Sequence, residues 1–313
     1  MCSFFCAIDT QNGFDELEIN KMTNALKLSS HRGPDYTGVE LYKSKPNFKS
    51  NNLFMGHNRL SIIDLSEKGN QPLVKEHLTI IFNGCIYNYK EIIEEHKLSQ
   101  NSNSDTEVIL DLYLKYGVES FNMLNGDWAF VLYDRKASKL IVSRDRYGVK
   151  PFHVYRDNNK IYFASELKQI LPFMKEKKLN NEVMLSYLYF GQFGDENTSL
   201  LQGVEELTPA SYLEFDLING TERKNIYWDI EEKSKNFKFK DSKVEHFEEL
   251  LNDAINIRNR ADVKKGCLLS GGLDSSAIGI ELNNKAVDFF SYKSDDEDDE
   301  YKKHLTDNNL INS

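Results

Sequence analysis

The residue best suited to covalent chemistry is the cysteine at position 2. We expect Met1 to be removed because the side chain of Cys2 is small, which leaves the Cys2 thiol beside a free α-amine. Such an amine has an ordinary pKa of about 7.7–8.0, so near neutral pH it can accept the thiol proton. One residue can therefore supply both a nucleophile and its general base. For an isolated Cys2, the alternative is a small apolar residue at the start of a strand.

Four motifs that follow Cys2 in order favour the chemical alternative. They are HRGPDYTG at 31–38, GHNRLSIIDL at 56–65, NGCIYNY at 83–89 and SDTE at 104–107. In this order they closely resemble the glutaminase domain of asparagine synthetase, a class II glutamine amidotransferase with an N-terminal nucleophile fold. Further similarity comes from RDRYGVKP at 144–151, FASELK at 163–168 and YWD at 227–229. The resemblance thus extends through nearly the whole chain.

The resemblance implies roles for individual residues. Cys2 matches the nucleophile that attacks the glutamine amide and forms a glutamyl thioester. The side-chain amide of Asn83 and the backbone N–H of Gly84 match the oxyanion-hole donors. Arg59 matches the residue that holds the glutamine α-carboxylate, and Asp105 matches the acceptor for the α-ammonium. Taken singly, Arg59 also suits a surface ion pair and Asp105 a helix N-terminal acid.

The sequence departs from the family at three positions near these residues. Cys85 stands where the family has a glutamate that helps to bind the glutamine ammonium, so one anchoring charge is lost from the set Arg59, Asn83, Cys85 and Asp105. We therefore expect weaker glutamine binding. Ser3 and Cys6 replace glycines, and their side chains are expected to crowd the nucleophile turn. His31 and His57 are expected to position loops through hydrogen bonds.

A glycine-containing loop marks the second part of the chain. It lies between an apolar strand-like segment and a helical one, where backbone N–H groups and a helix N-terminus can bind phosphate. Its form resembles the PP-loop, which implies binding of ATP, with Asp274 helping to hold Mg²⁺ at pyrophosphate. It lacks the spacing and lysine of a Walker A loop. An ordinary glycine turn is the alternative. The implied ATP-binding residues are Leu269, Ser270, Gly271, Gly272, Leu273, Asp274, Ser275 and Ser276.

The apolar pattern predicts the elements that position these residues. A helical stripe at 19–26 and another at 108–113, opened by the capping box Ser104-x-x-Glu107, are expected to cover sheet faces. The resemblance implies an α+β N-terminal-nucleophile hydrolase fold, an αββα sandwich of antiparallel sheets, followed by the start of an α/β PP-loop nucleotide-binding domain. The predicted strands are Ser3–Ile8, Leu78–Phe82, Ala129–Tyr133, Lys139–Ser143, Ile161–Ala164 and Tyr212–Asp216.

Two domains are expected. A glutaminase domain occupies 2–230, a charged segment without periodicity at 231–243 is expected to be a linker, and 244–313 forms an incomplete synthetase domain. That last part shows a helical stripe at 244–255 and strands at 267–269 and 287–292. A doubly wound sheet usually needs about five or six strands.

Composition narrows the functional classes. The 313 residues carry a net charge of −10, which argues against nucleic-acid binding. Residues 295–300 are all acidic, a run more typical of a solvated segment than of a cation site. The four cysteines are too scattered for a disulfide framework or a common zinc site. The N-terminal apolar run is too short for a signal peptide or a membrane span, so we expect a cytoplasmic protein.

Three functions remain open. The first is an asparagine synthetase that hydrolyses glutamine and passes ammonia to ATP-activated aspartate, β-aspartyl-AMP, giving asparagine, AMP and pyrophosphate. The second is a stand-alone glutaminase or an ammonia donor, and the third is a catalytically weakened glutamine-binding module. The implied partners are glutamine, ATP and aspartate, together with a homodimer partner or a polypeptide that completes the synthetase domain. The glutaminase half is expected to need no cofactor.

Overall fold

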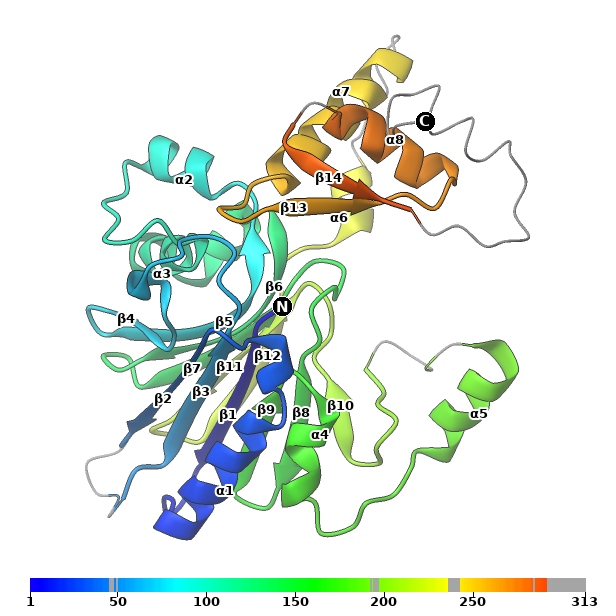
Figure 1. Ribbon diagram of the computed structural model, residues 1–313. Helices are drawn as coiled ribbons and strands as arrows, with labels where there is room; N and C mark the ends of the chain where they lie inside the picture. The colour runs from blue at the N-terminus through cyan, green and yellow to red at the C-terminus, as the bar shows by residue number, and fades with distance from the viewer. Residues whose placement is uncertain are drawn as a thin grey trace. The chain divides into compact units, whose positions relative to one another are not determined.

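The chain divides into two units, Met1–Lys233 and Ser234–Ser313. The computed structural model describes residues 1–44, 48, 50–191, 193, 197–235, 243–283 and 285–291 (Figure 1). The acidic run at 295–300 and Tyr292, the last residue of a predicted strand, lie outside these ranges. None of the helices in the described ranges combines the length and hydropathy that crossing a bilayer requires.

The first sheet of the N-terminal unit holds the strand that follows Cys2. Its six strands are all antiparallel, in the order β10-β8-β9-β1-β3-β2. The N-terminal strand β1 therefore lies in the interior of the sheet, paired with β3 on one side and β9 on the other. The strands are β1 Ser3–Asp9, β2 Tyr36–Tyr42, β3 Leu53–Arg59, β8 His153–Asp157, β9 Lys160–Ala164 and β10 Val204–Glu206.

The second sheet of this unit is also antiparallel and six-stranded. Its order is β12-β11-β7-β6-β5-β4. Strand β5 runs beyond the short β4, so its last residues pair only with β6. The strands are β4 Leu73–Lys75, β5 Leu78–Ile86, β6 Gly126–Asp134, β7 Lys139–Arg144, β11 Ser211–Asp216 and β12 Thr221–Ile226.

Helices cover the outer faces of both sheets (Figure 1). Helix α1 packs on β1 and β3, α4 on β9, and α3 on β5 and β4, with α2 beside α3. The α-helices of the unit are α1 Glu16–Lys27, α2 Tyr89–His96, α3 Asp105–Tyr116, α4 Leu167–Ile170, α5 Asn181–Phe190 and α6 Ile230–Ser234. Short 3-10 helices lie at Ser30–Arg32, Glu67–Gly69, Gly117–Met123 and Leu171–Phe173.

The two faces of β1 show how the layers are stacked. Because side chains alternate along a strand, Phe4, Cys6 and Ile8 enter the cluster between the sheets, whereas Phe5 and Ala7 enter the cluster under α1. A third cluster joins the outer face of the second sheet to α2 and α3. The layers are therefore helix, sheet, sheet, helix, which confirms the predicted αββα sandwich.

Each predicted strand is present, but others were missed. Every residue of β12 is exposed and β2 is mostly exposed, so neither carries a continuous apolar run. The capping box predicted at α3 is wrong for Glu107, whose side chain does not bond back to the Ser104 N–H. Ser104 does cap the helix by accepting from the Thr106 N–H. Glu107 instead accepts from the N–H groups of Asn101 and Ser102 and pairs with Lys75.

The C-terminal unit begins a parallel sheet. Strands β13 Lys265–Leu268 and β14 Val287–Phe290 pair in parallel, and α8 Leu273–Leu282 connects them. They follow α7 Lys243–Arg258, so the helix, strand, loop, helix and strand order matches the prediction. Leu268 and Leu273 are 80% and 85% exposed, because in the described part of this unit two strands cannot enclose both faces of a parallel sheet.

The core between the sheets should dominate stability. Phe152 is fully buried against the rings of Phe4 and Phe163. Phe152→Ala is expected to lower the free energy of unfolding by about 3–5 kcal/mol. Phe190→Ala is the matched control, since Phe190 is 77% exposed on α5, and it should change stability by less than about 0.5 kcal/mol. Urea unfolding followed by tryptophan fluorescence reports on this unit, which holds both tryptophans. Equal losses in the two variants would contradict this assignment of the core.

Candidate active site

Cys2 lies at the N-terminal end of β1 and is anchored on two sides. Its Sγ atom accepts from the Leu60 N–H at 3.4 Å and lies 3.6 Å from the Leu60 carbonyl oxygen. Its own carbonyl oxygen accepts from Arg32 Nε at 3.0 Å. Burial raises the pKa of the Cys2 thiol, an effect that the Leu60 N–H opposes. The thiol therefore rests in its protonated form and needs a base before it can act as a nucleophile.

The end of β5 presents backbone donors on the side away from β6. The backbone groups of Trp128, which is opposite Gly84 in the ladder, bond to Asp145 instead. Gly84 and Trp128 thus form a non-hydrogen-bonded pair of the antiparallel ladder. The Gly84 N–H therefore points away from β6. The N–H groups two residues before and after it are taken by side chains: Phe82 N–H by Gln71 Oε1 at 2.6 Å, and Ile86 N–H by Asp105 Oδ2 at 2.8 Å.

Asn83 adds a second donor at the same place. It is 1% exposed, and its Nδ2 atom has no hydrogen-bond partner among the described residues. An unpaired buried donor costs roughly 1–3 kcal/mol, so it points to a ligand that accepts from it. A side chain at Gly84 is excluded, because a Cβ atom there would lie 2.2 Å from the Asp127 carbonyl oxygen.

Arg59, at the end of β3, is buried and held by the loop that follows it. Its Nη1 donates to the Ser66 carbonyl at 2.8 Å and to Asn70 Oδ1 at 2.9 Å, and its Nη2 donates to the carbonyls of Ile63 and Asp64. The guanidinium is therefore fixed in place before any ligand arrives.

Asp105 and Cys85 form a coupled pair. Asp105 is the first residue of α3 and is 5% exposed, and burial raises its pKa to about 6. Burial and the Asp105 charge together raise the pKa of the Cys85 thiol, which hydrogen-bonds to that carboxylate. Asp105 thus keeps a negative charge at neutral pH, and the thiol beside it stays neutral.

One cavity of about 130 Å³ brings these residues together. Cys2, Arg59, Asn83, Gly84, Cys85 and Asp105, all the residues expected at the glutaminase site, line it. Sequence reasoning missed Leu60, Gln71 and Lys150, which also line it. Leu60 and Lys150 lie inside the motifs at 56–65 and 144–151. Leu60 contacts Cys2 through its backbone and Lys150 is placed by a turn, and residue type predicts neither feature.

Lys150 reaches the cavity from a turn that a buried carboxylate organises. The Asp145 side chain accepts from the N–H groups of Tyr147 and Val149 at 3.1 and 2.9 Å, and from that of Lys150 at 2.9 Å. Asp145 is 1% exposed. The motif at 144–151 therefore encodes a rigid turn that places one positive charge at the cavity.

The departures from the family pattern are accommodated without crowding Cys2. The Ser3 hydroxyl is buried and bonds to Ser29 and Asn58, and Cys6 lies in the core between the sheets. Of the two histidines expected to position loops, only His31 contacts a loop residue, whereas His57 joins strand β3 to strand β5. His57 Nε2 bonds to the Phe82 carbonyl at 2.9 Å, and His31 Nε2 lies 3.3 Å from Glu166. The expected crowding is therefore not found.

The loop before α8 has a compact, hydroxyl-braced form. Gly271 adopts φ +78°, and Ser275 Oγ lies 3.1 Å from Ser270 Oγ and accepts from the Ser270 N–H at 3.2 Å. The first turn of α8 presents the N–H groups of Leu273, Asp274 and Ser275, which have no partner within the helix. Ser276 is buried, whereas Asp274 is exposed.

Comparison with known proteins identifies the family. Residues 1–228 match the model of the glutamine amidotransferase domain, and residues 246–305 match that of asparagine synthase. The solved structure of the allosteric regulatory enzyme of purine biosynthesis aligns with 95% of this chain and 67% of its own, at a TM-score of 0.52 and 16% identity, which supports the fold alone. The fold is that of the N-terminal nucleophile glutamine amidotransferases. The chain belongs to the glutamine amidotransferase domain family.

Curated relatives extend well beyond this chain. A Methanocaldococcus jannaschii protein, provisionally named asparagine synthetase (glutamine-hydrolysing) 2, is 40% identical over 280 residues, which are 83% of this chain and 53% of that protein. Amidase chry2 of Gibberella zeae is 35% identical over 277 residues, 85% of this chain and 39% of that protein. The chain spans about half or less of the length of these relatives.

The raised pKa of Asp105 predicts a gain in stability when its charge is removed. Between about pH 4 and pH 6 the folded chain keeps a proton that the unfolded chain has lost, so the Asp105 contribution to stability falls as pH rises. Asp105→Asn is thus expected to raise the free energy of unfolding by roughly 1–3 kcal/mol at pH 7.5 and by less at pH 4.5. Urea unfolding at the two pH values measures this. An equal change at both would show that the charge is not the cause.

Proposed function

We propose that the N-terminal unit hydrolyses glutamine to glutamate and ammonia, with Cys2 as the nucleophile once Met1 has been removed. The observation that carries the proposal is that two donors line the cavity with the Cys2 thiol: Asn83 Nδ2, which has no hydrogen-bond partner among the described residues, and the Gly84 N–H, which points away from β6. A thiol beside two buried, preorganised donors suits attack on a carbonyl carbon. Membership of the glutamine amidotransferase domain family supports an amide of glutamine as that carbonyl.

The reaction begins with proton transfer within Cys2. Its α-amine takes the thiol proton, and Sγ forms a bond to the glutamine amide carbon. The carbonyl electron pair moves onto oxygen, and the resulting oxyanion accepts from Asn83 and Gly84. Donors of this kind contribute about 10²–10³-fold in rate each. The carbon–nitrogen bond then breaks with proton return from the amine, which releases ammonia and leaves a glutamyl thioester. Water, activated by the same amine, hydrolyses it.

The remaining residues of the cavity bind the amino-acid end of glutamine. Arg59 and Lys150 supply positive charge for the α-carboxylate, and Asp105 supplies negative charge for the α-ammonium. Cys85 is neutral where a second carboxylate would strengthen that contact. This last observation favours, as a second candidate, a weakened glutamine-binding module. Kinetics distinguishes the two.

The C-terminal unit is proposed to bind ATP and so extend the function to asparagine synthesis. In support, the first turn of the ten-residue helix α8 and the loop before it present backbone N–H groups, which suit phosphate. The exposed Asp274 carboxylate fits a hard cation such as Mg²⁺, which when bound neutralises phosphate charge. The ATP-binding residues would be 269–276. The match of residues 246–305 to the asparagine synthase model favours this assignment.

The acceptor of the ammonia is proposed to be aspartate, activated as β-aspartyl-AMP. This part rests on the asparagine synthase match, since relatives carry the names of both a synthetase and an amidase. The strands that complete the β13–β14 sheet would come from a longer chain, from a second copy or from another polypeptide. Four free cysteines suit a reducing compartment, so we place the reaction in the cytoplasm.

Glutamate release from glutamine without ATP tests the glutaminase proposal. We expect activity in the chain that has lost Met1 and none in Cys2→Ala, because only Cys2 carries the thiol and amine together. Cys267→Ser, in the other unit, is the control and should keep full activity. Mass spectrometry of the N-terminus accompanies the assay. Activity in Cys2→Ala, or a retained Met1 in active protein, would sink the proposal. Formation of asparagine, AMP and pyrophosphate would support the extension to synthesis.

Restoring the lost carboxylate should improve glutamine binding. A charge-assisted hydrogen bond is worth about 1.5–3 kcal/mol, so Cys85→Glu is expected to lower KM for glutamine by roughly 10- to 150-fold, with a smaller effect on kcat. Cys85→Ser removes the thiol without adding charge and should not lower KM. Steady-state glutaminase kinetics on the three proteins measures the difference. An unchanged or higher KM in Cys85→Glu would defeat the explanation.

A further inference from the structure

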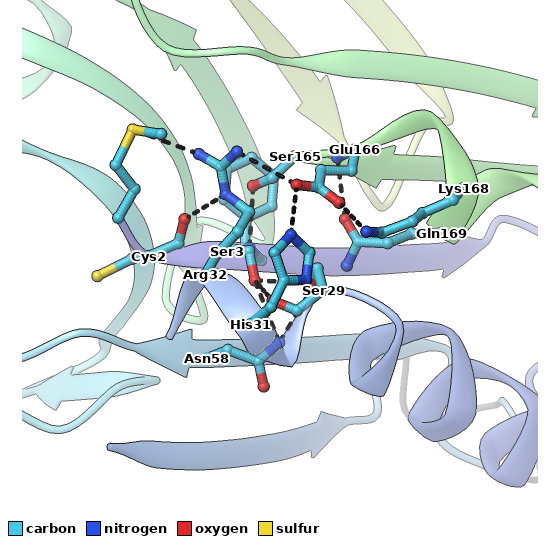
Figure 2. A network of polar contacts seen from close by, with 12 residues as sticks. Cys2, Ser3, Ser29, His31, Arg32, Asn58, Ser165, Glu166, Lys168 and Gln169 are labelled. Carbon is cyan, nitrogen blue, oxygen red and sulfur yellow. Dashed lines mark hydrogen bonds and ion pairs between the residues drawn. The ribbon is translucent and has the colours of Figure 1, made fainter. Parts of the chain in front are cut away.

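A chain of polar contacts leads away from Cys2 on the side opposite its thiol. Figure 2 shows Arg32 between the Cys2 carbonyl and Glu166, with the Cys2 sulfur pointing away from this network. Arg32 Nε donates to the carbonyl oxygen at 3.0 Å, and its Nη1 donates to Glu166 Oε1 at 3.3 Å. Neither Arg32 nor Glu166 is among the described residues that line the cavity. Their contribution to Cys2 is therefore made through its main chain.

Glu166 is the point where the side chains of Arg32, His31 and Lys168 meet. Its Oε1 also lies 3.3 Å from His31 Nε2, and its Oε2 lies 2.8 Å from Lys168 Nζ. Although burial acts to raise it, hydrogen bonds from Lys168 and Arg32 hold the pKa of Glu166 below its ordinary value. A carboxylate that stays ionised fixes the Arg32 guanidinium, since a charged pair is roughly twice as strong as a neutral one.

The consequence for Cys2 follows from the geometry of its Cα atom. That atom carries three heavy substituents: the carbonyl carbon, Cβ and the nitrogen. Arg32 anchors the carbonyl, and the Leu60 N–H anchors Sγ. Once two substituents are fixed, the direction of the third is fixed as well. No hydrogen bond to the described residues is needed to aim the nitrogen, so after the proposed removal of Met1 its lone pair can accept the thiol proton.

The residues that follow Cys2 are held in the same way. The Ser3 hydroxyl bonds to Ser29 at 2.8 Å, and the Phe4 N–H donates to Ser165 Oγ at 3.0 Å, beside Glu166 in the sequence. The segment after β9 therefore contacts both the main chain of β1 and the arginine that holds Cys2. Orientation errors of about 1 Å at a reacting group can cost 100-fold in rate.

We propose that Glu166 is a positioning residue of the glutaminase site, which acts through Arg32 to aim the Cys2 amine at the Cys2 thiol. This inference rests on the proposed function. It assigns to Glu166 an effect on the chemical step and none on glutamine binding, because Glu166 lies outside the cavity lining.

Steady-state glutaminase kinetics on Glu166→Gln tests the role. We expect kcat to fall by about 10- to 100-fold with KM for glutamine changed by less than about 2-fold. Glu166→Asp, which keeps the charge, should recover part of kcat. Glu214→Gln is the matched control: Glu214 is 22% exposed against 20% for Glu166, pairs with Lys139 at 2.9 Å and has no contact with Cys2, so its kcat should be unchanged.

A double-mutant cycle distinguishes positioning from a general structural effect. Arg32→Met should lower kcat at least as far as Glu166→Gln, and the double variant should be no slower than Arg32→Met alone. Thermal melting confirms that each variant is folded at the assay temperature. Multiplicative losses in the double variant, or a KM effect as large as the kcat effect, would overturn the role while leaving the glutaminase itself intact. A wild-type chain without glutaminase activity would instead overturn the proposed function and this inference together.

Discussion

The pairing of β1 inside the first sheet is the constraint on which the site depends. β1 is hydrogen-bonded to β3 and β9, and every residue of it is buried. A strand held on both edges and covered on both faces has little freedom to shift along its neighbours, because a slip of one residue would exchange its two faces. Cys2 immediately precedes this strand. The position of this proposed nucleophile is therefore set by the packing of the whole sandwich.

The same two-residue period organises the opposite wall of the cavity. Along β5 the N–H groups of Phe82, Gly84 and Ile86 point away from β6, and side chains from two other segments take the outer two. The middle group is left for a ligand. The site is thus built where the ends of β1 and β3 from the first sheet meet the end of β5 from the second, with helix α3 supplying Asp105. The negative charge of the buried Asp105 lowers the stability of the folded chain when no ligand is bound, as is common for residues at binding sites.

Much of this arrangement could be predicted from the sequence, for reasons that differ between residues. The predicted strands of this unit became β1, β5, β6, β7, β9 and β11, because continuous apolar runs identify strands buried on both faces. The interior strands β3 and β8 were missed, because in both a short apolar run gives way to polar residues. Strand β12 was missed because all its residues are exposed and it carries no apolar run, although it pairs with the preceding strand β11 across the short turn at 217–220. The motifs identified Asn83, Gly84 and Asp105 by residue type. Leu60 contacts Cys2 through its backbone N–H, and Glu107 pairs with Lys75 where a helix-capping contact was predicted. Neither contact could be predicted from a local sequence pattern.

The interior position of β1 also has a consequence for biosynthesis. The Phe4 N–H bonds to a residue 161 positions later, so this contact cannot form until more than half of the chain has been made. At about 5–20 residues per second, that interval lasts about 8–30 s. The N-terminus leaves the ribosome before its β9 partner has been made. The proposed removal of Met1 and the assembly of the site would thereby be separated in time: the amine would be released first, and the partners that aim it would be made afterwards.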